Sequence, residues 1–170
     1  MTPSPAPADD NIRPDYVHPT PVRPTRRRSP MPPGSLIASD HEALKHLAGL
    51  VGDCSDDAVL WVTFLSADDR ALALVLPIDD LPSMPDNATT AALAAAMRDV
   101  VGKVYPGAQA LVAIVRPTGG DYGDHERSWA DALWRAADAT GWSIRMIAAV
   151  GADRSRVLDR ARCVPHADLR

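Results

Sequence analysis

The stretch Ala110-Leu-Val-Ala-Ile-Val115, followed by Arg116-Pro-Thr-Gly-Gly-Asp-Tyr-Gly-Asp-His-Glu126, decides how this chain folds. An unbroken apolar run predicts a buried strand, and the polar Gly-rich segment after it predicts a loop at the carboxyl end of that strand. A helical pattern then runs from Glu126 to Ala139 and returns over the sheet. Ligands of open α/β sheets bind at this end of the strands, so the loop is the place to look for a site.

A short helix is predicted well before this strand. Ser39 and Glu42 have capping-box spacing, and the helix ends at Gly52. His41 and His46 are one residue off the spacing of a metal-ligand pair on one helix face, so we expect both at surface or boundary positions. The apolar stripe of this helix consists of Leu44, Leu47, Leu50 and Val51.

Two apolar runs, at 58–65 and 71–76, follow this helix and are separated by the polar segment 66–70. Their length and the turn residues between them predict a β-hairpin. Pro77 then begins a proline-containing segment that is expected to break the chain.

Two longer helices and two further strands complete the pattern. An Ala-rich helix is predicted over 88–104, and a strand over 142–150 follows the helix that ends at Ala139, with a short last strand near Val157. The inward face of the first helix is expected to hold Leu93, Met97, Val100, Val101 and Val104. That of the second is expected to hold Trp129, Leu133, Ala136 and Ala137.

Together these elements predict the α/β (α+β) class. We expect a mixed sheet of about four to five strands, with a β-hairpin start, β-α-β crossovers and three helices packed on it.

The first 34 residues differ in composition from the rest. They hold ten of the sixteen prolines and carry a net charge of +2, whereas the remainder carries −6. We predict a disordered Pro/Arg-rich arm over 1–34, one globular domain over 35–165 and a tail over 166–170. The cluster Arg26, Arg27 and Arg28 is the candidate partner-binding part of the arm, by weak contact with nucleic acid or an acidic partner. Three arginines form a small patch, so a solvated arm is the favoured alternative.

Composition points to a protein of the bacterial cytoplasm. Nothing in the sequence resembles a signal peptide or a membrane-spanning segment, so no membrane association is expected. Cys54 and Cys163 lie far apart and match no metal-ligand spacing. Arginine greatly outnumbers lysine, which with plentiful Ala, Asp and Pro is typical of a high-GC bacterial genome.

The loop itself offers a set of candidate site residues. Its glycines can aim backbone N–H groups at an anion, and the helix that follows adds the positive end of its dipole. The spacing matches no nucleotide-binding motif, so structural use of the glycines in a tight loop is favoured over phosphate binding. The candidates are Arg116, Pro117, Thr118, Gly119, Gly120, Asp124, His125 and Glu126.

The order of the predicted elements resembles the JAB/RadC-like domain over about residues 58 to 158. These elements are the hairpin, the Ala-rich helix, a strand, the Arg-Pro-Thr-Gly-Gly loop, the Glu-Arg-Ser-Trp-Ala-Asp-Ala-Leu helix and a final strand. That resemblance implies a fold akin to the cytidine-deaminase fold. Active members carry His-x-His-Pro-Ser-Gly after the strand and bind zinc through the two histidines and an aspartate on the next helix. An upstream glutamate activates the metal-bound water in the peptidase members.

This chain departs from the family pattern at the metal ligands. The two histidines fall on Ile114 and Arg116, while Pro117 and Thr118-Gly119 keep the Pro-Ser-Gly turn. Glu126, or less closely Asp124, falls near the metal-binding aspartate. The resemblance therefore implies a member without the metal, and we expect the Arg116 guanidinium to occupy the vacated position and pair with Glu126 or Asp124.

Three functions stay open at this point. The first is a non-catalytic JAB/RadC-like module, a pseudoenzyme without metal or cofactor that binds an unidentified protein partner, with the arm as a tether. The second is a hydrolase that uses His125 and its acidic neighbours as acid/base groups or as a relocated metal site. The third is a nucleic-acid accessory protein, suggested by the arm and by Arg154, Arg156, Arg160 and Arg162. The residues favour a protein without enzymatic activity, no residue is assigned a catalytic role, and the oligomeric state is open.

Overall fold

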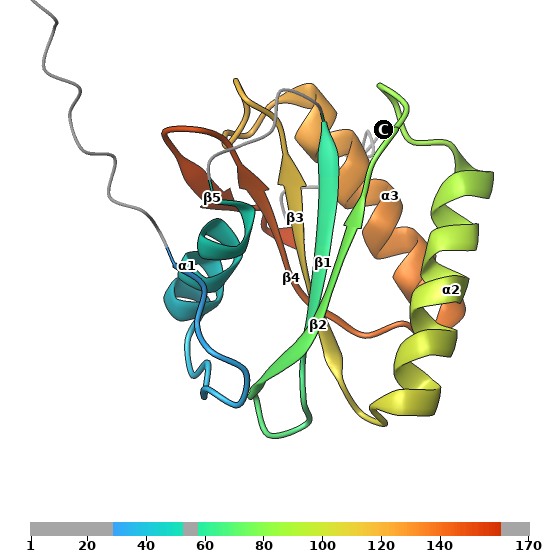
Figure 1. Ribbon diagram of the computed structural model, residues 1–170. Helices are drawn as coiled ribbons and strands as arrows, with labels where there is room; N and C mark the ends of the chain where they lie inside the picture. Colours follow the sequence, from blue (N-terminus) through green and yellow to red (C-terminus); the bar gives the residue numbers. More distant parts are fainter. Residues whose placement is uncertain (1–28, 53–57, 161–170) are drawn as a thin grey trace, which may run out of the picture.

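A single mixed sheet organises the chain. The computed structural model describes residues 29–52 and 58–160, and in them the sheet has one helix on one face and two on the other (Figure 1). The elements are α1 (Asp40–Val51), β1 (Val59–Leu65), β2 (Ala71–Ile78), α2 (Asn87–Val104), β3 (Gln109–Val115), α3 (Asp124–Thr140), β4 (Ile144–Val150) and β5 (Ser155–Val157). The predicted fold class is confirmed.

The strands lie in the order β2-β1-β3-β4-β5. β1 is antiparallel to both β2 and β3, β3 is parallel to β4, and β4 is antiparallel to β5. The parallel pair requires a crossover, which α3 supplies. The predicted hairpin and the strand–loop–helix–strand unit around residues 110–150 are therefore both confirmed.

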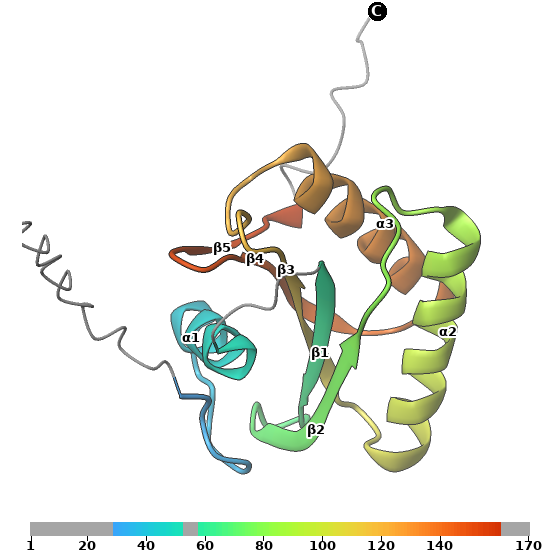
Figure 2. The same cartoon turned by 45° about the horizontal axis from the view of Figure 1, so that its top comes forward.

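The helices form two layers around the sheet (Figure 2). α1 lies against β3, β4 and β5 on one face, whereas α2 and α3 pack together on the other face. Each layer has its own apolar core. The core under α2 and α3 includes Phe64, Ile114 and Trp129, and the core under α1 includes Leu47 and Met146.

β2 is an edge strand, and it extends through Pro77 to Ile78. The prediction that Pro77 breaks the chain was wrong. Proline lacks a backbone N–H, but an edge strand has one side without a neighbouring strand, so proline is tolerated there. The chain leaves the sheet after Ile78, and Asp86 caps the start of α2 by accepting hydrogen bonds from the backbone N–H and the hydroxyl of Thr89.

The inward face of α2 differs from the predicted one. Thr90, Ala94, Met97 and Val101 are the buried residues of this helix, while Val100 and Val104 are exposed. The prediction was therefore right for Met97 and Val101 and wrong for Val100 and Val104. The buried stripe lies a part-turn away from the predicted one because it faces α3.

α3 has the predicted inward face, with Trp129, Leu133, Ala136 and Ala137 buried. It starts two residues before the predicted Glu126, at Asp124. It ends at Gly141, which adopts the left-handed conformation (φ 75°) that glycine tolerates.

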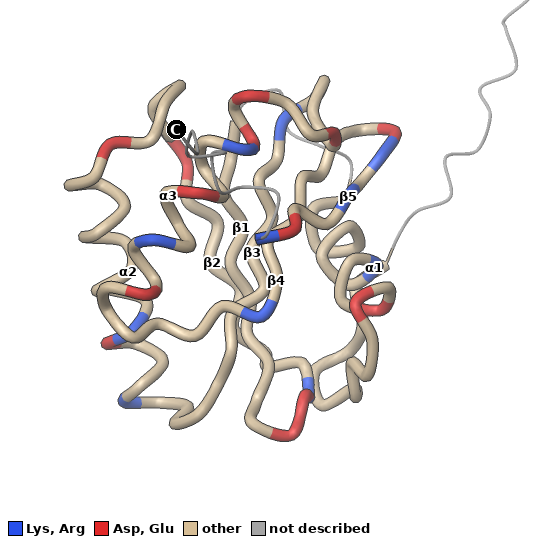
Figure 3. The backbone as a smooth tube through the Cα atoms, turned by 180° about the vertical axis from the view of Figure 1, so that it is seen from behind, with Lys and Arg blue, Asp and Glu red and all other residues tan. Residues whose placement is uncertain are grey.

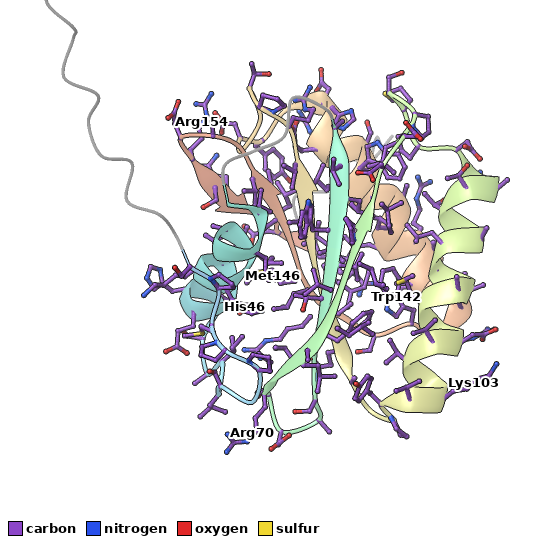
Figure 4. All side chains as sticks on the ribbon, in the orientation of Figure 1. His46, Arg70, Lys103, Trp142, Met146 and Arg154 are labelled. Atoms are coloured by element: carbon purple, nitrogen blue, oxygen red, sulfur yellow. The ribbon has the colours of Figure 1, made fainter. Side chains whose placement is uncertain are left out.

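Residues 29–37 lie against α1 and the start of β2. Gly34 N–H donates to Ala71 O, and Met31 N–H donates to His46 Nδ1 at 3.1 Å. His46 is 2% exposed, so its prediction as a surface or boundary residue was wrong, whereas His41 is exposed. His46 and Met146 lie in the layer between α1 and the sheet (Figure 4).

The other predicted boundaries concern residues that the structure does not describe. Residues 1–28 of the expected arm, including Arg26, Arg27 and Arg28, and the expected tail 166–170 lie outside the described residues. Within the described residues, no helix combines the length and the apolar character needed to cross a membrane.

Candidate functional site

The loop after β3 lies beside the turn that joins β4 to β5. Arg116 N–H donates to Val150 O at 3.2 Å, and Ala152 N–H donates to Pro117 O at 3.3 Å. Gly119 N–H donates to Arg116 O, which closes a tight turn around the exposed Thr118. The backbone of the loop is thus tied both to itself and to the β4–β5 turn.

Glycine is required where these two loops touch. A Cβ atom on Gly120, which has φ +83°, would lie 2.2 Å from Arg154 O. A Cβ atom on Gly151 would lie 2.2 Å from Gly119 O. Contacts this short exclude any side chain, and both involve backbone atoms of the opposite loop. These contacts give the glycines a packing role.

Arg116 and Glu126 form the ion pair at the centre of the site. Arg116 Nε donates to Glu126 Oε1 at 2.8 Å, and an Nη atom of Arg116 donates to the same oxygen at 2.6 Å. Glu126 is 1% exposed, and the Arg116 side chain is 33% exposed. Of the two expected partners of Arg116, the structure therefore selects Glu126.

The second oxygen of Glu126 faces glycine. Among the described residues Oε2 is buried and has no hydrogen-bond partner. A Cβ atom on Gly123 would lie 2.5 Å from Oε2, and one on Gly119 would lie 2.9 Å from Oε1. The carboxylate of Glu126 therefore occupies space that side chains at positions 119 and 123 would fill.

Asp124 and His125 point to other partners. Asp124 is exposed and pairs with Arg127, one turn further along α3. His125 Nδ1 lies 2.8 Å from Ser83 O. Because a carbonyl only accepts hydrogen bonds, Nδ1 is the donor in this contact, while Nε2 is buried without a partner among the described residues.

His125 thereby fastens the loop before α2 to the start of α3. Trp129 adds a second link, since its Nε1–H donates to Pro82 O at 3.3 Å. In the described part of the chain, the His125 side chain forms no hydrogen bond or ion pair with the side chain of Arg116 or of Glu126. The candidate residues thus include a buried ion pair, Arg116 and Glu126, and a separate residue, His125, that links the loop before α2 to α3.

Asp121 also belongs to this region, although it was not among the candidate site residues. Its carboxylate pairs with Arg154 at 3.0 Å and with Arg156 at 3.4 Å, so it links the site loop to the β4–β5 turn and to β5. Arg160 pairs with Asp138 on α3. Three of the four arginines in the predicted basic concentration therefore face a carboxylate, and Arg162 lies outside the described residues. Figure 3 shows the molecule from behind, with acidic and basic residues interspersed around β5 and the loops at the ends of β3 and β4.

The zinc site implied by the resemblance does not fit these residues. Ile114 is buried in the apolar core beneath α3 and offers no ligand atom, and Arg116 places a cation beside Glu126. Within residues 29–52 and 58–160, no group of three or more His, Cys, Asp or Glu side chains is arranged so that it could hold a metal ion.

The sequence matches no protein-family model and no curated protein.

Proposed function

We propose that this protein is a metal-less JAB/RadC-like module that acts by binding a protein partner, with residues 1–34 as its tether. The observation that carries the proposal is the ion pair between Arg116 and Glu126. It lies where the resemblance would put one zinc-binding histidine and the zinc-binding acid. A permanent cation there occupies the place of a metal ion and neutralises the buried carboxylate.

The order of the elements along the chain supports the same proposal. The hairpin of β1 and β2, then α2, β3, α3 and β4, follow one another in the order on which the resemblance rests. The turn Pro117-Thr118-Gly119 follows β3 directly, and α3 begins at Asp124.

Metal analysis of the purified full chain, expressed with supplemented zinc, tests the absence of a metal. We expect well below about 0.1 zinc per chain. About one zinc per chain, lost in His125→Ala, would overturn the proposal in favour of a hydrolase with a relocated site.

A gain-of-function variant tests the resemblance itself. Replacing Ile114 and Arg116 by histidine restores the family's two imidazoles opposite Glu126. We expect this double variant to take up about one zinc per chain, and the single variant Arg116→His to take up much less. A folded double variant that takes up no zinc would count against the resemblance.

Partner binding is tested by comparing three forms of the chain as bait: the full chain, a chain lacking residues 1–28, and the full chain with Arg26, Arg27 and Arg28 replaced by serine. The deletion stops before residue 29 because Met31 and Gly34 form hydrogen bonds with the folded domain. We expect a protein retained by the full chain and lost with the arm. A steep salt dependence of RNA or DNA binding, lost in the same two variants, would favour the nucleic-acid function instead. The paired arginines of the domain and its net charge of −6 outside the arm weigh against that alternative.

A further inference from the structure

The exposed large apolar side chains of the described residues gather near one helix. There are four of them in that part of the chain, and only Leu36 lies elsewhere. Met84 (60% exposed) lies just before α2, and Val100 (39%) and Val104 (60%) lie on it. This helix is on the outside of its layer, and no described element covers its outer side (Figures 1 and 2).

These valines continue a regular ridge. Every fourth residue of α2 from its second position is apolar and exposed, namely Ala88, Ala92, Ala96, Val100 and Val104. Residues four apart form the ridges by which helices most often pack against one another. The opposite stripe of α2, with Ala94, Met97 and Val101, is already buried. The ridge therefore offers a second apolar surface against which another helix can pack.

The ridge is complementary to itself when reversed. If two copies of α2 cross in antiparallel orientation with Ala96 at the two-fold axis, Ala92 lies opposite Val100 of the second copy, and Ala88 lies opposite Val104 of the second copy. Ala88 and Ala92 then each meet a valine, and the two copies of Ala96 at the centre permit close approach.

The charges at the two ends of α2 fit the same orientation. Asp86 caps the N-terminus, and Lys103 is the basic residue of the last turn. Lys103 extends away from the rest of the molecule (Figure 4). Antiparallel crossing brings the basic end of one helix towards the acidic end of the other and opposes the two helix dipoles, whereas a parallel arrangement brings like charges together.

We propose that the exposed ridge of α2 is an interface through which two copies of this chain pair in antiparallel orientation. The inference is independent of the site at the end of β3, because α2 contributes none of the residues of that site.

Analytical ultracentrifugation of the full chain tests the proposal. An interface made by one helix per subunit is small, so the measurement spans about 10 to 500 μM. We expect a monomer–dimer equilibrium that Ala96→Glu weakens at least about tenfold. Ala139→Glu is the matched control, since Ala139 is an exposed helical alanine on α3. A monomer at all concentrations, or a dimer that Ala96→Glu leaves intact, would overturn the proposal.

Disulfide trapping tests the orientation. In a background with Cys54 and Cys163 changed to serine, chains carrying Ala92→Cys are mixed with chains carrying Val100→Cys and oxidised. We expect the mixed disulfide to exceed both like-with-like products, and Ala96→Cys to cross-link with itself. A predominance of like-with-like products at positions 92 and 100, or a dimer lost only when residues 1–28 are removed, would show another interface.

Discussion

Arg116 holds Glu126 through one oxygen only. Two nitrogens of its guanidinium donate to Oε1, at 2.8 and 2.6 Å, while Oε2 has no hydrogen-bond partner in the described structure. In the usual bidentate arrangement each carboxylate oxygen receives its own donor. Because Glu126 is almost fully buried, the Arg116 guanidinium replaces the water that would otherwise stabilise the carboxylate charge.

Arg116→Ala is therefore expected to destabilise the fold by about 3 kcal/mol, the lower end of the range for breaking a buried ion pair, because the guanidinium is partly exposed. The loss leaves a buried carboxylate without a partner. Urea unfolding monitored by tryptophan fluorescence measures it. Adding Glu126→Gln to Arg116→Ala is expected to restore part of the stability, since the uncompensated charge is then removed.

The matched control for that experiment is Arg98→Ala. Arg98 also pairs with a carboxylate, that of Asp99, but both side chains are about half exposed. Its loss is expected to change the free energy of unfolding by less than about 1 kcal/mol. Equal effects of Arg98→Ala and Arg116→Ala would contradict the central role of the buried pair.

Gly151 and Gly102 provide opposite predictions for the same substitution. A Cβ atom on Gly151 would meet the backbone oxygen of Gly119 at 2.2 Å, so Gly151→Ala must move one of the two loops. We expect it to destabilise by about 3 kcal/mol, the upper end for overpacking. A Cβ atom on Gly102, in α2, meets nothing within 4 Å, so Gly102→Ala is expected to stabilise by about 0.5 to 1 kcal/mol.

Both glycine variants are measured by the same unfolding experiment, and a two-dimensional NMR spectrum locates the perturbation. For Gly151→Ala the shifted resonances are expected in the loop 116–123 and in the β4–β5 turn. A Gly151→Ala variant as stable as the native protein would show that this contact is looser than the geometry indicates.

The sequence predicts the central part of the fold well because its signals are local. The apolar run before Arg116, the glycines after it and the helical period from Glu126 onward each depend on neighbouring residues, as does the hairpin. The pairing of Arg116 with Glu126 was also within reach, since both flank one short loop. Their separation of ten residues is bridged by the turn into α3.

Features that depend on packing between distant segments were not predictable in this way. His46 is buried because residues 29–31 lie against α1. Met31, which bonds to His46, precedes it by fifteen residues in the sequence. Asp121 pairs with Arg154 because β4 lies beside β3, which places the β4–β5 turn next to the loop that follows β3. Val100 and Val101 are adjacent apolar residues that point about 100° apart around the axis of α2, so the packing of α2 against α3 decides which of the two is buried.

His46 is expected to make the fold less stable in mild acid. Its Nδ1 accepts the Met31 N–H, so the folded state holds the neutral ring, and burial lowers the pKa of His46 below its ordinary value. The unfolded chain therefore binds a proton more readily than the native one, and stability is full above about pH 6.5 and falls as the pH drops below it.

This acid sensitivity is measured by urea unfolding between pH 7.5 and 5. The contribution of His46 to the slope is at most about 1.4 kcal/mol per pH unit, the value for one proton. We expect His46→Gln to flatten the profile, since glutamine does not titrate, whereas His41→Gln, at an exposed position of the same helix, should leave it unchanged. If both variants keep the native slope, the acid sensitivity comes from other groups and the contact with Met31 does not depend on the charge of His46.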